Sequence, residues 1–228
     1  MFDLFETLAR FWPPREDIQK EASQPFGFQL TSAGIIDGYR EADAFMAFEN
    51  ANGLPIRLRA ADETRKFFIK YEQLVLKGDA FDVDSNIAGQ IWDNVRNTPH
   101  DLLLFDDSLP ALVELHSFGI ILGIISNYNM NGQDLLKQLG IDKILQFALT
   151  SHDTGFLKPH SPIFEVALEQ AGVAAEEAIY VGDQYYSDIL GARTVNINPL
   201  LINRYSDDEQ LHGVDVITSL YDVKEFLG

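Results

Sequence analysis

A short apolar run that ends in a glycine and two aspartates constrains the fold of this chain more than any other stretch. Residues 178–181 show no polar alternation, which is typical of a strand buried on both faces of a parallel sheet. Gly182 ends the run, Asp183 follows at once, and Asp188 comes five positions later, where a helical segment begins. In open α/β sheets, ligands bind beyond the carboxyl ends of the strands. The two carboxylates are therefore expected at a ligand-binding edge.

Asp183 and Asp188 would repel each other if both were ionised and close together, unless a cation lay with them. A hard divalent ion with oxygen ligands, Mg²⁺ above all, suits such a site. Aspartate is also a favoured N-cap residue of helices, so the pair alone leaves two interpretations open. The rest of the chain has to decide between a metal site and two helix caps.

Length and composition exclude several classes of protein. The 228 residues allow one large domain or a core with a smaller insert, and the absence of cysteine excludes disulfides, thiolate nucleophiles and zinc–thiolate sites. A formal net charge of −18, without any run of lysine and arginine, argues against a nucleic-acid partner. The longest apolar run, residues 118–125, is too short to span a bilayer, and no signal peptide is visible. We expect a soluble cytoplasmic protein without a membrane partner.

From Asp107 onward, apolar runs of strand length alternate with helical segments. The expected strands are residues 120–125, 147–150, 178–181, 200–203 and 214–218. The expected helices are residues 107–116, 133–139, 161–171 and 187–192, followed by one at the C-terminus. This alternation predicts an α/β fold with a parallel sheet and right-handed crossovers.

Between Trp12 and His100 the apolar pattern has the period of a helix. The expected helices are residues 33–50, residues 62–75 and residues 84–95. No strand-length apolar run interrupts this block, which predicts a small helical domain. Residues 82–93 faintly resemble a calcium-binding loop, but Ile87 stands where glycine is required, so a helix N-terminus with favourable acidic residues is preferred.

Polar residues follow four of the expected strand ends. They are Asp3 with Thr7, Ser126 with Asn127, Lys158 in the loop after residue 150, and Asp183 with Asp188. Singly, each has an ordinary explanation, because serine and aspartate cap helices and lysine is usually a surface residue. Together they supply an acidic metal site, a hydroxyl, a cation and a carboxylate at one edge of the sheet. Their order after successive strands favours a shared chemical site.

On these residues the chain resembles the haloacid dehalogenase-like hydrolase superfamily. The segments Gly182-Asp-x-x-x-x-Asp188 and Ile124-Ile-Ser-Asn127 match motifs of that superfamily, and the likeness extends over nearly the whole chain. It implies a Rossmann-like parallel sheet core with a helical cap domain inserted after the first strand. The core would comprise residues 1–12 and 101–228, and the cap residues 13–100.

The resemblance also implies a role for each matching residue. Asp3 would be the nucleophile that forms an aspartyl-phosphate, dividing one difficult step into two, and Lys158 would balance the charge of the phosphate and of Asp3. The expected phosphoryl-binding groups are the hydroxyls of Thr7 and Ser126, with backbone amides near Phe5 and Asn127. The expected ligands of Mg²⁺, which would offset developing charge, are Asp3, the Phe5 carbonyl, Asp183 and, directly or through water, Asp188.

The chain departs from the phosphatases of this superfamily two places after the nucleophile. They usually carry a second aspartate there as general acid and base, where this chain has Phe5. Because general acid–base catalysis is worth about 10²–10⁴-fold, slow turnover of poor leaving groups is expected. Glu6 is a candidate substitute acid; the alternative is a side chain that points to solvent. Dehalogenases of the superfamily also carry an aromatic residue in this place, but they need no metal and generally lack the motif with the two aspartates.

The first expected strand is very short, because only Met1 and Phe2 precede Asp3. Strands typically run about five or six residues, so this central strand would leave a gap in the sheet. We hypothesise that the natural chain starts upstream, which the intact mass of the native protein would test.

The combined features favour a Mg²⁺-dependent phosphomonoester hydrolase that acts on a small phosphorylated metabolite. The alternative from another class is a catalytically weak member that binds a phosphorylated ligand or a partner, and 2-haloacid dehalogenation comes third. Substrate choice would lie in the cap, where Arg40, Arg57, Arg59 and Lys66 are candidate contacts for an anionic substrate. The identity of the substrate and the oligomeric state stay open.

Overall fold

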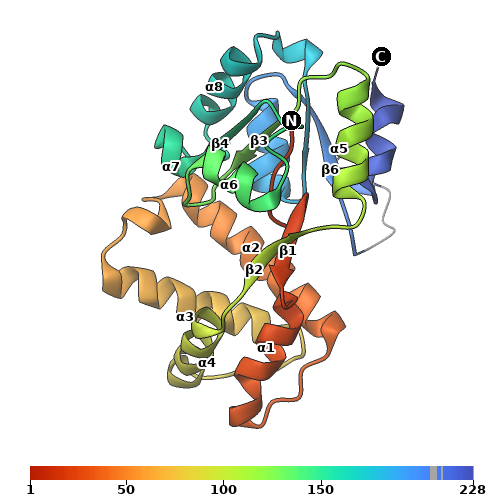
Figure 1. The fold of residues 1–228 in the computed structure, drawn as a ribbon. Helices are drawn as coiled ribbons and strands as arrows, with labels where there is room; N and C mark the ends of the chain where they lie inside the picture. Colours follow the sequence, from red (N-terminus) through yellow and green to blue (C-terminus); the bar gives the residue numbers. More distant parts are fainter. Residues whose placement is uncertain (206–209, 212, 228) are drawn as a thin grey trace. The chain divides into compact units, whose positions relative to one another are not determined.

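The computed structural model describes residues 1–205, 210–211 and 213–227. The chain divides into two compact units, which we call the core unit (Met1–Arg10 and Leu102–Gly228) and the helical unit (Phe11–Asp101). Where the chain passes between them, β1 (Ala9–Trp12) and β2 (Asp101–Leu104) pair in a two-stranded sheet (Figure 1). The sequence predicted no strand at either place. Both runs have only four residues, too few for a clear alternation of apolar and polar positions.

The core unit is built on a parallel sheet with one short antiparallel strand at its edge. In spatial order the strands are β4 (Phe147–Thr150), β3 (Gly123–Ser126), β5 (Ile179–Gly182), β6 (Asn198–Ile202), β8 (Val214–Ile217) and β7 (Gln210–Leu211). The pairs β3–β4, β5–β6 and β6–β8 are parallel, whereas β7 runs antiparallel to β8. The predicted α/β fold with a parallel sheet is thus confirmed, although β3 begins three residues later than expected.

Phe2 lies between β3 and β5 and joins the two parts of the sheet. It forms parallel bridges to Ile124 on one side and to Val181 on the other. Its N–H donates to the Gly123 carbonyl and its carbonyl accepts from Ile125, both at 2.9 Å. The expectation of a gap is therefore wrong at this level of the sheet. Even one paired residue fixes the position of the next side chain, Asp3.

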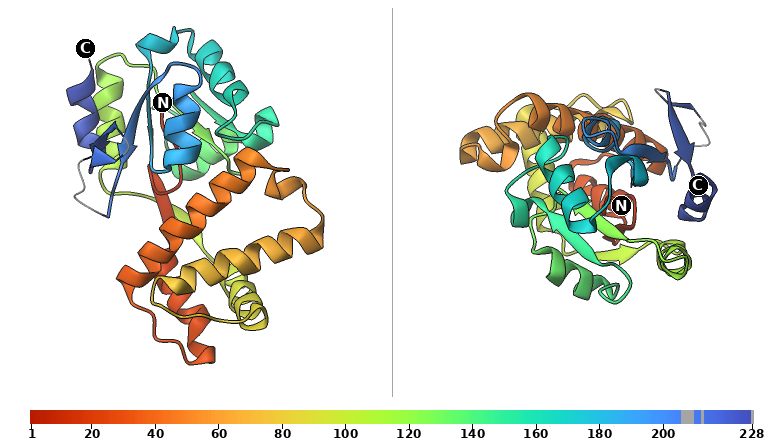
Figure 2. Two further views of the ribbon diagram at one scale, coloured as in Figure 1. Left: turned by 180° about the vertical axis from the view of Figure 1, so that it is seen from behind. Right: turned by 90° about the horizontal axis from the view of Figure 1, so that it is seen from above.

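Helices cover both faces of this sheet (Figures 1 and 2). On one face pack α5 (Ser108–Ser117), α6 (Gly132–Leu139) and the 3₁₀-helix η5 (Leu220–Phe226); on the other pack α8 (Ser161–Ala171) and α9 (Leu190–Arg193). Neighbouring residues of one strand serve opposite faces: Ile124 and Val181 belong to the first core, Ile125 and Tyr180 to the second. The short elements α7 (Ser151–Thr154) and η3 (Ala175–Glu177) complete the unit.

The helical unit has four α-helices, in agreement with the helical pattern of the sequence. They are α1 (Arg15–Ser23), α2 (Ser32–Asn52), α3 (Ala61–Lys77) and α4 (Ser85–Asn97), with 3₁₀ turns η1 (Gln24–Phe26) and η2 (Ile56–Leu58). Asp84 accepts hydrogen bonds from two backbone amides at the start of α4, so the helix-cap interpretation of that acidic segment is confirmed. Among the described residues, no helix is both long and apolar enough to cross a membrane.

Glycines and aromatic rings determine how the helices of this unit pack. At Gly38 of α2 a Cβ would overlap the Val75 carbonyl of α3, so glycine permits the close approach of the two helices. Phe68 of α3 stacks on Trp92 of α4 with ring centroids 4.3 Å apart. Such contacts pin one helix to the next over a small area.

A buried polar network also joins α1, α2 and α3. The fully buried Glu72 accepts a hydrogen bond from Gln19 Nε2 at 2.5 Å, and the Tyr39 hydroxyl donates to Gln19 Oε1 at 2.9 Å. Burial raises the pKa of Glu72 from 4.5 to about 7, with the hydrogen bond from Gln19 opposing the shift. Burial in this core therefore favours the protonated, uncharged form of Glu72.

Candidate active site

The turn after β5 folds an aspartate back over the strand end. Residues Tyr185–Ile189 form a π-helical turn, η4, in which Ile189 N–H donates to the Gln184 carbonyl. The Asp188 carboxylate returns to Gly182, where any Cβ would overlap it, so glycine is required there. Asp188 Oδ2 accepts from the Gln184 amide at 3.0 Å. Asp183 lies at the strand end itself. The sequence predicted the two aspartates and the helical segment but not its wider winding.

A buried lysine connects Asp188 to the first strand end. The Nζ of Lys158 donates to Asp3 Oδ1 at 2.5 Å, to Asp188 Oδ1 at 2.6 Å and to the Tyr180 hydroxyl at 2.9 Å. An ammonium has three N–H groups, and all three are used here. Burial alone would lower the pKa of Lys158, but the charges of Asp188 and Asp3 outweigh it and raise that pKa. Lys158 therefore stays protonated.

The backbone of Lys158 is held by the side chain of Asn127. Asn127 Oδ1 accepts from the Lys158 amide at 2.7 Å, and Asn127 Nδ2 donates to the Lys158 carbonyl at 3.1 Å. This reciprocal pair ties the end of β3 to the loop that carries the lysine. The predicted role of Asn127 was in binding phosphoryl oxygens through its backbone, which stays a prediction; its side chain has a positioning role that the sequence did not reveal.

Asp3 occupies the centre of the site with a perturbed acidity. Its burial raises the pKa from 3.8 to about 6, Lys158 lowers it, and Asp188 raises it further. Two hydrogen bonds hold the Asp3 carboxylate, one from Lys158 to Oδ1 and one from the backbone of Leu4. Because Phe2 is fixed in the sheet, the position of this carboxylate is set by the backbone as well.

Asp3, Asp183 and Asp188 form the one group of potential metal ligands found among the described residues. One carboxylate oxygen of each lies within 4.8 Å of the others. Three carboxyl groups surround one ammonium, so acidic groups are in excess, and oxygen donors suit a hard cation. The residues therefore fit a divalent ion such as Mg²⁺. The predicted participation of the Phe5 carbonyl stays a prediction.

Two hydroxyl groups lie near the ends of the central strands: Ser126 is the last residue of β3, and Thr7 lies in the turn after Asp3. Thr7 is fully buried, and its Oγ1 has no hydrogen-bond partner among the described residues. An unsatisfied buried hydroxyl costs about 1–3 kcal/mol, so a ligand oxygen that accepts its proton would remove this cost. Ser126 Oγ accepts from the Tyr128 amide at 3.2 Å and keeps its own proton to donate. Both groups fit their predicted role, which stays a prediction.

Glu6 does not point to solvent, contrary to one of the two interpretations of its role. It is buried, adopts a positive φ of 60°, and accepts from the Tyr205 hydroxyl at 2.5 Å. The neighbouring Arg204 donates from Nη2 to the Thr7 carbonyl at 2.5 Å and from Nη1 to Asp107. The loop after β6 thus holds the turn that follows Asp3, which nothing in the sequence indicated.

The candidate substrate contacts of the helical unit form ion pairs within that unit. Arg40 pairs with Asp37 at 2.8 Å, Arg59 with Glu49 at 3.0 Å and Lys66 with Asp62 at 3.6 Å. The role proposed for them and for Arg57 stays a prediction.

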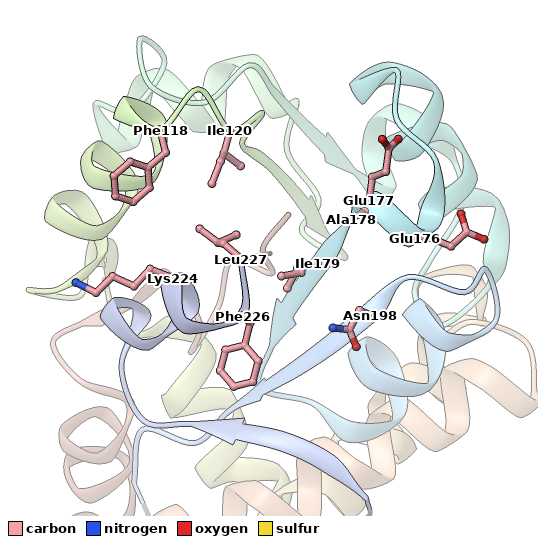
Figure 3. Close-up of a pocket in the computed structure, with 10 residues that line it drawn as sticks. All are labelled: Phe118, Ile120, Glu176, Glu177, Ala178, Ile179, Asn198, Lys224, Phe226 and Leu227. Atoms are coloured by element: carbon pink, nitrogen blue, oxygen red, sulfur yellow. The ribbon is translucent and has the colours of Figure 1, made fainter.

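A separate cavity of 670 Å³ lies at the opposite end of the sheet (Figure 3). Apolar side chains such as Ile120, Ile179 and Leu227 line it, and Glu177 and Lys224 stand at its sides. Ile179 begins β5, whereas Asp183 follows the end of that strand. The three clustered aspartates and the buried Lys158 lie at the other end of the strands, where ligands bind in open α/β sheets.

Comparison with known proteins agrees with this geometry. A family model described as haloacid dehalogenase-like hydrolase matches residues 60–202, more than half of the chain. The haloacid dehalogenase-like hydrolase domain-containing protein 3 of Danio rerio is 33% identical over 126 residues, which cover 55% of this chain and 51% of that protein. The glyceraldehyde 3-phosphate phosphatase of Methanothermobacter thermautotrophicus is 34% identical over 131 residues, covering 54% and 58%. The chain spans about half the length of these curated relatives.

The fold has close counterparts among solved structures. The HAD-hydrolase YfnB from Bacillus subtilis, solved with magnesium bound, superimposes with a TM-score of 0.64 at 18% identity, covering 99% of this chain and 96% of that one. At such identity the likeness concerns the fold alone. The family model, the parallel sheet and the acidic strand ends lead to one conclusion: the chain belongs to the haloacid dehalogenase-like hydrolases.

Proposed function

We propose that this hydrolase is a Mg²⁺-dependent phosphomonoesterase that acts on a small phosphorylated metabolite through an aspartyl-phosphate on Asp3. One observation carries the proposal: a buried ammonium, Lys158, bonds both Asp3 and Asp188 within a cluster of three carboxylates at the carboxyl ends of the strands. A nucleophilic carboxylate, a fixed cation and a site for a divalent ion are the groups that transfer of a phosphoryl dianion requires.

The first step makes use of the way in which Asp3 is held. Lys158 donates to Oδ1 of Asp3, so we assign the attack on phosphorus to Oδ2. The new bond joins Oδ2 to phosphorus while the bond from phosphorus to the ester oxygen breaks. Lys158 keeps Asp3 from rotating and balances the charge that gathers on the phosphoryl oxygens, for which the Thr7 and Ser126 hydroxyls are donors.

Mg²⁺ held by Asp3 and Asp183, with Asp188 behind them, would supply further positive charge beside the phosphoryl oxygens. Its fit rests on the donor set described above. Asp188 already accepts from Lys158, Tyr180 and Gln184, so its part in holding the ion would be the more indirect one.

The leaving oxygen and the hydrolytic water set the speed of this reaction. The departing alkoxide needs a proton, and the water that later attacks the aspartyl-phosphate has to lose one. Phe5 offers no titratable group for either transfer, and Glu6 is engaged with Tyr205. The proposed enzyme therefore favours activated esters, whose leaving groups need no protonation.

The partial likeness to a glyceraldehyde 3-phosphate phosphatase suggests the size of the substrate. That relative shares 34% identity with this chain over 131 residues but is matched along only 58% of its length. We include small phosphorylated sugars and aldehydes in the proposed class for that reason. The cationic residues of the helical unit are the proposed contacts for the remainder of the substrate.

The test is hydrolysis of p-nitrophenyl phosphate with Mg²⁺, with EDTA, and by Asp3→Asn. Activity that is lost in EDTA and in the variant, together with acid-stable, hydroxylamine-labile phosphate on the wild-type chain, is the expected result. Asp142→Asn, at an exposed position of the core unit, serves as a matched control and should keep full activity.

Two other outcomes would replace the proposal. A folded protein that binds inorganic phosphate but turns over no ester would be the catalytically weak binding member. Release of chloride from 2-chloropropionate that EDTA does not affect would identify a dehalogenase. Dehalogenases of the superfamily also carry an aromatic residue in the place of Phe5.

A further inference from the structure

Tyr180 is a buried tyrosine in the middle of β5 whose hydroxyl reaches the catalytic lysine. Its ring is fully buried and packs edge-on against Phe164, with centroids 5.3 Å apart. Phenylalanine would fill that place equally well, because the ring alone makes this contact. The hydroxyl at its tip would be costly in an apolar core unless it were hydrogen-bonded. Its presence therefore needs an explanation from the polar groups around it.

The hydroxyl of Tyr180 has three polar neighbours. Lys158 Nζ lies at 2.9 Å, the Ile125 carbonyl at 3.1 Å and Asp188 Oδ1 at 3.2 Å. An ammonium can only donate, so the hydroxyl accepts from Lys158. Its single proton is then directed to the Ile125 carbonyl or to Asp188. Burial, with the nearby charges of Asp188 and Asp3, raises the pKa of Tyr180 well above 10, so the hydroxyl stays neutral.

Tyr180 completes a three-point attachment of the Lys158 ammonium. Two attachment points, Asp3 and Asp188, are charged and belong to the proposed chemistry. The third is neutral and rests on a backbone carbonyl of β3. With only the two carboxylates as partners, the ammonium could turn about the axis between them. A third partner on a rigid strand removes that freedom, which matters because Lys158 holds Oδ1 of Asp3 and so helps to fix the orientation of that carboxylate.

We propose that Tyr180 is a positioning residue of the phosphoryl-transfer site: its hydroxyl orients the Lys158 ammonium and, through it, Asp3. The proposal rests on the function proposed above. It assigns to Tyr180 no contact with the substrate and no ligation of the metal. Loss of the hydroxyl should therefore slow formation of the aspartyl-phosphate without weakening the binding of ester or Mg²⁺.

The experiment compares the wild type, Tyr180→Phe and Tyr186→Phe. The Tyr186 side chain is 43% exposed, so its variant is a matched loss of one hydroxyl from a side chain that faces solvent. For Tyr180→Phe we expect kcat on p-nitrophenyl phosphate to fall roughly 10- to 100-fold, the range for one hydrogen bond to a charged group. KM and the Mg²⁺ concentration for half-maximal activity should change less than about twofold, because a residue that only positions Lys158 contributes to the binding of neither ester nor metal. Tyr186→Phe should match the wild type.

A second readout does not depend on turnover. Beryllofluoride adds to an aspartate oxygen and imitates the phosphorylated residue, so its affinity in the presence of Mg²⁺ reports the geometry of Lys158 and Asp3. Tyr180→Phe should bind it roughly tenfold more weakly, and Tyr186→Phe as tightly as the wild type. If the wild type binds beryllofluoride but hydrolyses no ester, the proposed function fails while this ratio still decides the role of Tyr180.

Equal kcat and equal beryllofluoride affinity in the wild type and Tyr180→Phe would overturn the inference. A wild type that neither binds beryllofluoride nor hydrolyses an ester would also overturn it. So would a Tyr180→Phe variant with lower kcat, higher KM and lower thermal stability together, because that pattern indicates a purely structural role. Should Tyr180→Phe fail to fold, p-aminophenylalanine at position 180 keeps the size of the side chain and replaces the hydroxyl with a neutral amine, a weaker acceptor for the Lys158 ammonium. It should then reduce beryllofluoride affinity by a smaller factor in the same direction.

Discussion

At the scale of single residues, position 5 has the largest effect on what this site can do. The groups around Asp3 hold the proposed nucleophile and balance charge, but the place two residues on carries Phe5, which is half-buried and has no proton to give. The described residues of the site therefore provide groups for the attack on phosphorus but none for the proton transfers of the proposed reaction. Attack by Asp3 is well supported, whereas proton transfer to the leaving group and from the water is left to solvent.

Phe5→Asp should therefore raise activity. A carboxyl group at this position would act as general acid, and we expect kcat on an alkyl phosphate such as glycerol phosphate to rise by roughly 10²-fold. On p-nitrophenyl phosphate, whose leaving group needs no protonation, the gain should be small. Steady-state kinetics on both esters measures the difference, with Phe5→Leu as the control that changes shape without adding an acid. Equal gains on both esters would contradict the explanation.

Glu72 should make the helical unit pH-sensitive. Its pKa, raised from 4.5 to about 7, means that between these values the folded chain holds a proton that the unfolded chain has lost. Stability therefore decreases as pH rises through this window, by about 3 kcal/mol in total. Urea unfolding should show Glu72→Gln more stable than the wild type at pH 8 and similar to it at pH 4.5. Glu63→Gln, at an exposed site of α3, should show no such change; a pH-independent effect of Glu72→Gln would count against this account.

The residues that the sequence did not reveal share one property: their importance depends on a partner far along the chain. Tyr180 stands in an apolar run, where its hydroxyl carries no signal, and its partner Lys158 is 22 positions away. The side-chain role of Asn127 also requires Lys158, 31 positions on. Asp183 and Asp188, by contrast, were predictable because strand, glycine and spacing are all local features. The period of a sequence pattern indicates which face of a strand or helix a residue occupies, but not which polar group from a distant segment it contacts there.

At the scale of the elements, glycine determines how closely neighbouring segments approach. The helices α2 and α3 meet at Gly38, where backbone lies against backbone. The same absence of a side chain at Gly182 lets the turn η4 bring its carboxylate over the end of β5. The sequence predicted Gly182 as the end of a strand and gave no role to Gly38. In the structure each is a place where another segment requires the space.

Gly38→Ala should accordingly destabilise the protein. The added methyl would meet the Val75 carbonyl, and the overpacking should cost about 2 kcal/mol in spite of the better helix propensity of alanine. Gly89→Ala in α4 is the matched control, because its Cβ would lie at an ordinary 3.4 Å from Ile69 and stability should rise by up to about 1 kcal/mol. Chemical denaturation of both variants measures this. Similar free energies of unfolding for the two variants would show that the approach of α2 to α3 does not depend on glycine.

At the scale of the whole molecule, net charge and metal binding both affect the stability of the folded chain. The chain carries a formal charge of −18, which favours solubility and opposes compactness through self-repulsion. Within the core unit, the acidic cluster adds a local concentration of negative charge in a buried place. A divalent ion bound there would offset the repulsion between the clustered carboxylates directly, whereas monovalent salt screens charges mainly at the surface.

Mg²⁺ should therefore stabilise the chain beyond the effect of ionic strength. At a concentration roughly a hundred times its Kd, the ion should raise Tm by about 5–10 °C relative to NaCl of equal ionic strength. Asp183→Asn should lose most of this difference, and addition of EDTA should reverse it in the wild type. Differential scanning fluorimetry is sufficient for the measurement. An equal shift in the wild type and Asp183→Asn would place the ion elsewhere.

The wide turn η4 also limits how this segment can vary in length. A residue inserted or removed between Asp183 and Asp188 would change the rotational position of Asp188 about the helix axis and turn its carboxylate away from Lys158. Substitution at constant length is a milder change, since Tyr186 is exposed and has room for other side chains. A laboratory library built on this segment should therefore randomise identity and never spacing.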